Sequence, residues 1–359
     1  MNKRERLGFA GAALCAAAAL VGAAAAQEAE KSEPTALTGS AKLREEAIKV
    51  GELFESALVT DFLMAAPTVS DVAVRKVFLD RPNRVWYTPE QAAALPEEMR
   101  KGLREIDAGT DFYLGTTYGS PLAFSRLLDL AGSCGAQPQM TELRGKRVLD
   151  IGYGNIGHLR MMAARGAEAV GVDVDTLQPA LYRKPSDQGV VNGLDGKPAG
   201  TVTLVKGNWP SEPEAKEKVG TGFDIIASKN TLKRGYVHPW QPVDPKQLVH
   251  LNMSDAEYVK AVYAALKPGG LFVIYNICPP FAKGDEPYKP WADGRCPFDE
   301  RLLRDAGFVV LAFDQEDHKA SREMFVALGF APTMEEAAAS TFAWMTIAWK
   351  APEGFVAPK

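Results

Sequence analysis

Apolar residues recur every three or four positions along the first third of the chain, which is the spacing of an amphipathic helix. The pattern is clearest at residues 41–62. A Thr-Pro-Glu sequence at residues 88–90 predicts another helix start, because Thr can cap a helix and Pro fits its first position. A further helix is expected at residues 122–131. Residues 41–135 are therefore expected to form a helical region that acts as a lid.

From Lys146 onward the pattern changes to short apolar strands that alternate with helices. Strands are predicted at 147–151, 169–172, 201–206, 224–228, 271–276, 308–313 and 342–350, and helices begin near 156, 255, 298 and 321. This alternation predicts an α/β domain with a doubly wound parallel sheet, which we place at residues 136–359. Asn-Gly and Asp-Gly pairs within residues 189–200 predict a hairpin or surface loop.

The N-terminus has the pattern of an export signal. Three cationic residues within the first six positions precede an uncharged, alanine-rich run at residues 7–26, which ends in three alanines before Gln27. This pattern predicts a cleaved signal peptide at residues 1–26, a linker at 27–40 and a periplasmic location without stable membrane insertion. The alternative is an uncleaved N-terminal anchor, because the run is just long enough to span a bilayer.

Composition narrows the possible partners and metals. The 359 residues are 46% hydrophobic and 24% charged with a net charge of −4, and no long basic run is present, so nucleic acid is not an expected partner. Outside the signal segment the cysteines are Cys134, Cys278 and Cys296, without CxxC or Cys/His spacing, so no metal site is expected. Cys278 and Cys296 could pair in an oxidising compartment, or all three thiols could stay free. Composition does not indicate an oligomeric state.

A glycine-rich turn follows the first strand of the predicted sheet. The strand at 147–151 runs into Gly-Tyr-Gly-Asn-Ile-Gly at 152–157, where a helix is expected to begin. Glycines let the backbone turn sharply and approach a ligand closely, and the helix N-terminus offers N–H groups to an anion. Asp173 ends the next strand, about 20 residues further on, where its carboxylate can accept from both ribose hydroxyls. These features predict a nucleotide site.

Two features argue against a dinucleotide as the ligand. Asp150 lies two residues before the first glycine, where a dinucleotide fold would bury an apolar residue. A buried carboxylate needs a cationic or hydrogen-bonding partner, and the amino group of S-adenosylmethionine is such a partner. The second feature is Pro-Gly-Gly at 268–270 before a buried strand. An NAD-dependent oxidoreductase is therefore the disfavoured alternative.

With these motifs in this order, residues 110–350 resemble the class I S-adenosylmethionine-dependent methyltransferases. The resemblance implies a doubly wound, seven-stranded Rossmann-like sheet with a reversed terminal hairpin, and S-adenosylmethionine as the cofactor. This sequence has Asn208 at a position where the family often has Asp. The side-chain carbonyl of Asn208 can still accept a hydrogen bond from the adenine amino group. The cofactor-binding residues that the resemblance implies are Asp150, Gly152, Gly154, Gly157, Asp173, Asn208, Trp209 and Ser228.

The loop after the fourth strand contains the catalytic candidates. Methyl transfer from a sulfonium needs mainly alignment and desolvation, and a base only where the acceptor must lose a proton. His238 is the first candidate for that base, because the unperturbed pKa of a histidine side chain suits proton transfer at neutral pH. Tyr236 and Lys229 are lesser candidates.

The expected function is methyl transfer to a small organic acceptor, with oxygen as the candidate atom. The alternative is an exported, non-catalytic binding protein that keeps the fold, because S-adenosylmethionine is made and held in the cytosol.

Overall fold

The computed structural model describes residues 37–284 and 286–355. The predicted signal peptide and most of the predicted linker lie outside these residues. In the part of the chain that is described, no helix has both the length and the apolar character needed to cross a membrane.

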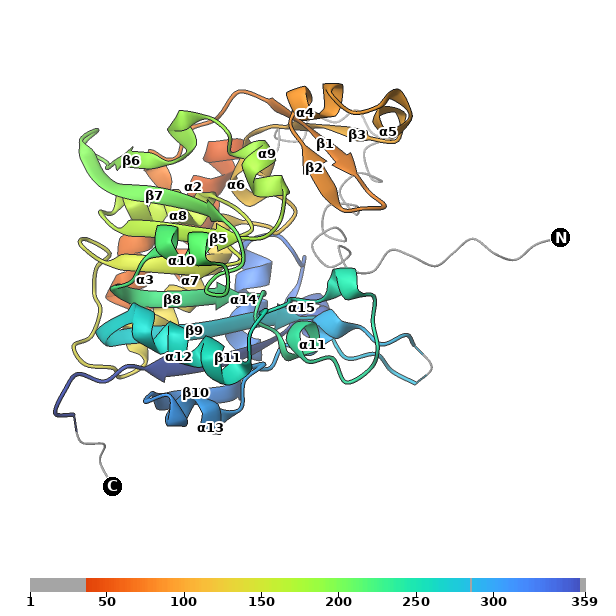
Figure 1. The fold of residues 1–359 in the computed structure, drawn as a ribbon. Helices are drawn as coiled ribbons and strands as arrows, with labels where there is room; N and C mark the ends of the chain where they lie inside the picture. The colour runs from red at the N-terminus through yellow and green to blue at the C-terminus, as the bar shows by residue number, and fades with distance from the viewer. Residues whose placement is uncertain (1–36, 285, 356–359) are drawn as a thin grey trace.

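The centre of the molecule is one eight-stranded sheet (Figure 1). Its strand order is β10-β11-β9-β8-β4-β5-β7-β6. The parallel strands are β4 (Arg147–Ile151), β5 (Glu168–Asp173), β7 (Pro198–Lys206), β8 (Phe223–Lys229) and β9 (Leu266–Cys278). The antiparallel strands are β6 (Gly189–Asn192), β10 (Val309–Glu316) and β11 (Phe342–Trp349). All seven strands predicted from the sequence are confirmed.

Alternate residues of each central strand enter two separate cores, because a parallel sheet is covered on both faces. On β4, Val148 packs on one face and Leu149 on the other, and both are fully buried. The helices α8 (Gly157–Ala164), α9 (Leu177–Leu181) and α14 (His318–Ala327) contribute to the first core. The helices α10 (Pro213–Val219), α12 (Asp255–Ala265) and α13 (Glu300–Asp305) cover the second face, in front of the sheet in Figure 1.

This architecture is a mixed α/β fold with a largely parallel central sheet, like Rossmann-like methyltransferase folds. The strand that begins the alternation, β4, lies at the centre, the chain winds outward in both directions from it, and β11 inserts antiparallel between β9 and β10. The predicted doubly wound sheet with a reversed terminal hairpin is confirmed. The eighth strand, β6, pairs antiparallel with β7 and comes from the hairpin predicted at residues 189–200.

The N-terminal region is not purely helical, so the prediction for residues 41–135 was wrong in this respect. Its helices are α2 (Gly39–Gly51), α3 (Ala57–Leu63), α4 (Pro89–Ala93), α5 (Glu97–Lys101), α6 (Thr110–Gly115) and α7 (Ser125–Ser133). Between them lies an antiparallel sheet of β1 (Arg75–Asp80), β2 (Val85–Tyr87) and β3 (Arg104–Ala108), with β1 in the middle. Two short helices, α11 (Arg234–Val237) and α15 (Met334–Ser340), complete the elements named in Figure 1.

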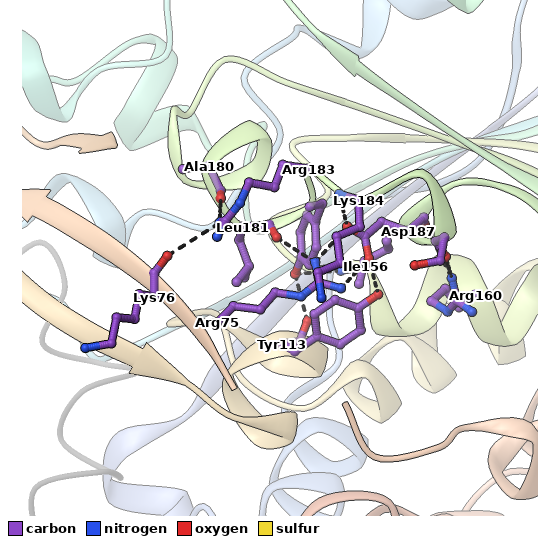
Figure 2. A network of polar contacts seen from close by, with 12 residues as sticks. Arg75, Lys76, Tyr113, Ile156, Arg160, Ala180, Leu181, Arg183, Lys184 and Asp187 are labelled. Carbon is purple, nitrogen blue, oxygen red and sulfur yellow. Dashed lines mark hydrogen bonds and ion pairs between the residues drawn. The ribbon is translucent and has the colours of Figure 1, made fainter. Parts of the chain in front are cut away.

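A buried polar network joins this small sheet to the main domain (Figure 2). Arg75 of β1 donates from Nη1 and Nη2 to the two carboxylate oxygens of Asp187, at 2.7 and 2.8 Å. The Tyr113 hydroxyl donates to the same carboxylate at 2.9 Å. The Tyr182 hydroxyl donates to the Tyr113 carbonyl at 2.9 Å and accepts from the Ile156 N–H at 3.1 Å. Because Ile156 precedes α8, the network connects β1 to the end of the glycine-rich turn.

Candidate cofactor site at the carboxyl edge of the sheet

The glycine-rich turn leaves β4 with two left-handed residues. Gly152 has a φ of +72° and Gly154 a φ of +58°, values that favour glycine because side chains rarely adopt them. The Gly152 N–H donates to the Val172 carbonyl at 2.8 Å, which keeps the turn against the end of β5. The Thr231 hydroxyl, just after β8, donates to the Gly152 carbonyl at 3.3 Å. The turn is therefore held between the carboxyl ends of β5 and β8.

Asp173 ends β5 beside this turn. Its Oδ2 accepts from the Gly154 N–H at 3.1 Å, and its Oδ1 accepts from the Asp175 N–H at 2.9 Å. The residue is only half-buried, so its carboxylate lies at the edge of the sheet with acceptor capacity left over. In doubly wound folds the ligand lies outside the carboxyl ends of the strands, and Asp173 occupies that edge. The residues present thus fit a ligand that donates hydroxyl hydrogens to a carboxylate.

Burial raises the pKa of Asp173 from 3.8 to about 6, and the neighbouring charge of Asp175 adds to the rise against the effect of the two hydrogen bonds. Because the folded pKa is raised, the contribution of this carboxyl to folding stability is complete below 3.8 and is lost as the pH rises through 6. A ligand that donates to the carboxylate favours its ionised form, so ligand binding has the opposite pH dependence.

We therefore expect the affinity for S-adenosylhomocysteine to fall at acid pH, by about tenfold for each pH unit below the pKa of Asp173. Calorimetric titrations between about pH 5 and 7.5 measure this dependence directly. The Asp173→Ala variant is the control and should lose most of the pH dependence. An affinity of the parent protein that stays constant over this window would remove the Asp173 carboxylate from the binding site.

Tyr118 covers the turn from the N-terminal region. Its hydroxyl donates to Asp175 Oδ2 at 3.0 Å, and its ring lies 2.9 Å from the point that a Cβ at Gly154 would occupy. The side chain is 44% exposed, so it forms part of the surface of the site. The sequence suggests that the aromatic loop containing Tyr118 could close over the pocket, but sequence reasoning did not assign Asp175 or Thr231. The available signal for these two was the position of a polar residue just after a strand.

Asp150 is a buried carboxylate near the end of β4. It is 2% exposed, and its Oδ2 accepts from His158 Nε2 at 2.7 Å. The predicted contact between its carboxylate and the amino group of the cofactor stays a prediction. The partner of its charge is an imidazole on the first turn of α8, which sequence reasoning had missed.

Three of the other predicted cofactor residues have packing or structural contacts. Trp209 is buried and packs edge-on against Tyr258, with ring centroids 6.3 Å apart. Ser228 is fully buried, and its hydroxyl oxygen accepts from the Leu232 N–H at 3.0 Å. Gly157 is buried at the start of α8, where a Cβ would lie 2.7 Å from the Leu114 carbonyl oxygen.

Asn208 stays a candidate for the adenine end of the cofactor. It is half-buried just after β7, and its Nδ2 donates to the His250 carbonyl at 2.5 Å. The atom used in this contact is the amide nitrogen, whereas the predicted contact to adenine uses the carbonyl oxygen. The two contacts are compatible in one side-chain orientation.

The catalytic candidates lie at the end of β8 and in the loop that follows it. His238 Nε2 lies 2.8 Å from Asp255 Oδ2, and the His238 side chain is 48% exposed. It borders a surface hollow of about 320 Å³ that His250 and Met253 also line. Lys229 ends β8 and Tyr236 lies in α11, and both are half-buried. The contacts of His238 are thus with α12, while those of the turn are with Thr231 and Tyr118.

The described residues contain no group of three His, Cys, Asp or Glu side chains that could hold a metal ion. Cys134, Cys278 and Cys296 are free thiols. Burial raises the pKa of Cys296 to about 12, so this thiol is protonated at neutral pH.

Comparison with known proteins gives no sequence match: no family model and no curated protein matches the chain. Among solved structures, an S-adenosylmethionine-dependent methyltransferase from Mesorhizobium loti has 17% identity over 58% of this chain and 93% of its own, with a TM-score of 0.35. Phosphoethanolamine N-methyltransferase 2 from Haemonchus contortus, solved with S-adenosyl-L-methionine, has 16% identity over 80% of this chain and 74% of its own, with a TM-score of 0.33.

The cyclase SpnF is a third match, at 18% identity over 58% of this chain and 76% of its own, with a TM-score of 0.33. At these identities and TM-scores the matches carry no argument about what this chain does. The assignment of the fold rests on the strand order and the antiparallel terminal hairpin of the chain itself.

Proposed function

We propose that this chain binds S-adenosylmethionine at the carboxyl edge of the sheet and transfers its methyl group to a small organic acceptor, with oxygen as the candidate acceptor atom. The bound cofactor would supply an activated methyl group. The chain would supply the glycine-rich turn, the Asp173 carboxylate for the ribose hydroxyls and an edge that Tyr118 shields from one side. These roles are alignment and desolvation, which are the main needs of this reaction.

The observation that carries this proposal is the position of Asp173. Its carboxylate accepts from the Gly154 N–H, so the ribose candidate and the glycine-rich turn form one unit at the end of β5. The half-buried carboxylate has acceptor capacity for hydroxyl donors. The fold places this unit at the edge where ligands of doubly wound sheets bind.

Replacing Asp173 with alanine should weaken S-adenosylhomocysteine binding by about 1–3 kcal/mol, because charge-assisted hydrogen bonds to the ribose are lost. Isothermal titration calorimetry at pH 7.5 measures the effect. The matched control is Asp195→Ala, which removes an exposed carboxylate in the turn between β6 and β7 and should leave the affinity unchanged. Equal affinities of Asp173→Ala and the parent protein would contradict the proposed ribose contact.

A second candidate function is ligand binding without catalysis, in an exported protein that keeps the fold. The observation that favours it is the position of His238. Its side chain is hydrogen-bonded to Asp255 at the surface, so the imidazole of the predicted base is paired with α12. Turnover assays with small hydroxyl-bearing acceptors distinguish the two functions.

If turnover is found, we expect His238→Ala to lower kcat by about 10²–10⁴-fold, the usual contribution of a general base, and to leave cofactor affinity near that of the parent. Asp255 would orient the imidazole for this role. His250→Ala is the control, because His250 lines the same hollow. A fall in cofactor affinity with unchanged kcat would mean that His238 only shapes the surface.

A further inference from the structure

The Asp150–His158 pair is almost completely removed from solvent. The two residues are 2% and 3% exposed, and Nε2 of the imidazole lies 2.7 Å from Oδ2 of the carboxylate. The second carboxylate oxygen, Oδ1, is also buried and has no hydrogen-bond partner among the described residues. A buried carboxylate is costly unless it is paired, so the imidazole is the group that makes Asp150 tolerable at this position.

The two residues lie at opposite ends of the glycine-rich turn. Asp150 is the next-to-last residue of β4, and His158 is the second residue of α8. The other imidazole nitrogen, Nδ1, lies 3.1 Å from Oδ1 of Asn155, which is inside the turn and 6% exposed. The contacts of one imidazole therefore connect the strand before the turn, the turn itself and the helix after it.

A residue of the N-terminal region supports the imidazole from its flat side. The Phe124 ring stacks on His158 with centroids 4.5 Å apart and planes inclined by 22°. Phe124 is 2% exposed. The imidazole thus has its two nitrogens in polar contacts and one face against an aromatic ring, which leaves it little rotational freedom.

We propose that His158 and Asp150 are positioning residues for the glycine-rich turn. They hold the Gly154 N–H at the place where it meets the Asp173 carboxylate, and they act on the cofactor only through the turn. The identity of the ligand in this inference rests on the proposed function. The role of the two residues in holding the turn does not depend on it. This role departs from the expectation that the Asp150 carboxylate binds the cofactor amino group directly.

Direct contact between Asp150 and the cofactor amino group makes a different prediction, because Oδ1 of Asp150 has no hydrogen-bond partner in the described part of the chain. A ligand amino group that reached this oxygen would pair with it. S-adenosylhomocysteine and its deaminated analogue, which keeps the carboxylate but lacks the amino group, are the two probes that separate the alternatives.

The test measures the affinity of both probes for the full-length parent and for the variants His158→Ala, His158→Gln, Asp150→Ala and the Asp150→Ala/His158→Ala double variant. We expect His158→Ala and Asp150→Ala each to weaken both probes equally, by about tenfold, as for one lost hydrogen bond in a positioned network. The double variant should bind both probes with about the same affinity as the weaker-binding of the two single variants, because the residues act as one unit. His158→Gln should restore most of the affinity, since its amide can donate to Asp150.

Leu303→Ala is the control for general loss of stability. Leu303 lies in α13 and is fully buried in the core on the other face of the sheet, so its truncation should lower the melting temperature while leaving both affinities near those of the parent. The proposal is overturned if the loss in Asp150→Ala is absent with the deaminated analogue, or if the two single losses multiply in the double variant. It is also overturned if Leu303→Ala weakens binding as much as His158→Ala.

Hydrogen exchange in the absence of ligand gives a second readout that does not depend on the proposed function. We expect the amides of residues 154–157 to exchange at least about tenfold faster in His158→Ala than in Leu303→Ala, because only the first variant releases the turn. Unchanged exchange in this segment would overturn the positioning role. If the parent protein bound neither probe, the proposed function would fail, and the exchange result would still decide whether His158 holds the turn.

Discussion

Replacing Gly154 with valine is expected to abolish binding of S-adenosylhomocysteine, with a loss of about a hundredfold or more, or roughly 3 kcal/mol. A φ of +58° is a strained conformation for a β-branched residue, and a Cβ at this position would lie 2.9 Å from the Tyr118 ring. The turn would have to move, and with it the N–H that meets Asp173. Calorimetry on the folded variant measures the loss.

Two variants separate backbone strain from the local clash. Gly135 has a φ of +84° and open space around its Cβ position, so Gly135→Val imposes strain away from the turn and should leave the affinity unchanged. Adding Tyr118→Ala to Gly154→Val removes the clash but not the strain, and should recover only part of the affinity. Normal binding by Gly154→Val alone would mean that the turn is not where the ligand binds.

The second large effect is expected at Arg75. Its guanidinium is the cationic partner of Asp187, which is fully buried, so Arg75→Ala should destabilise the folded protein by about 3–5 kcal/mol. Most of this loss comes from leaving the Asp187 carboxylate without a counter-charge. Urea unfolding of the parent and the variant measures the difference.

Arg183 provides a matched comparison within the same region (Figure 2). It is exposed and donates to the Ala180 carbonyl at 2.7 Å, so Arg183→Ala should cost less than about 1 kcal/mol. If the two variants were equally stable, the network would not be the connection between β1 and the main domain. A variant of Arg75 that is too unstable to purify would agree with the expected direction, and Arg75→Lys would then serve as the measurable variant.

The main sheet could be predicted from the sequence because its signals are local. Strands such as β4 are short apolar runs with a turn at each end, and their burial on both faces produces that pattern. The small sheet could not be predicted in the same way. In β1 the inward residues are Arg75 and Val77, and a buried arginine appears in a sequence as a surface residue. Only its partner, Asp187, makes the burial possible, and that residue is more than a hundred positions away.

The candidate site shows the same limit. Gly154 and Asp173 follow or end a strand, and there a motif predicts both where the residue lies and where its polar group points. The Gly154 N–H and the Asp173 carboxylate accordingly meet. For Asp150, the sequence predicts the position but not the partner, since His158 reaches it only after α8 has packed against β4. His238 depends on the path of a loop, and the loop directs it toward Asp255 of α12. Motifs within one element are therefore more informative than roles that depend on a second element.

The central claim is that the edge formed by the glycine-rich turn and Asp173 binds the cofactor of methyl transfer. Titration calorimetry of the full-length protein with S-adenosylmethionine, S-adenosylhomocysteine and NAD⁺ at pH 7.5 tests it most directly, with Asp173→Ala measured in parallel. We expect saturable one-to-one binding of the first two ligands, weakened in Asp173→Ala, and no binding of NAD⁺. Binding of NAD⁺ in place of the S-adenosyl ligands, or no binding of S-adenosylhomocysteine by a folded protein, would contradict it.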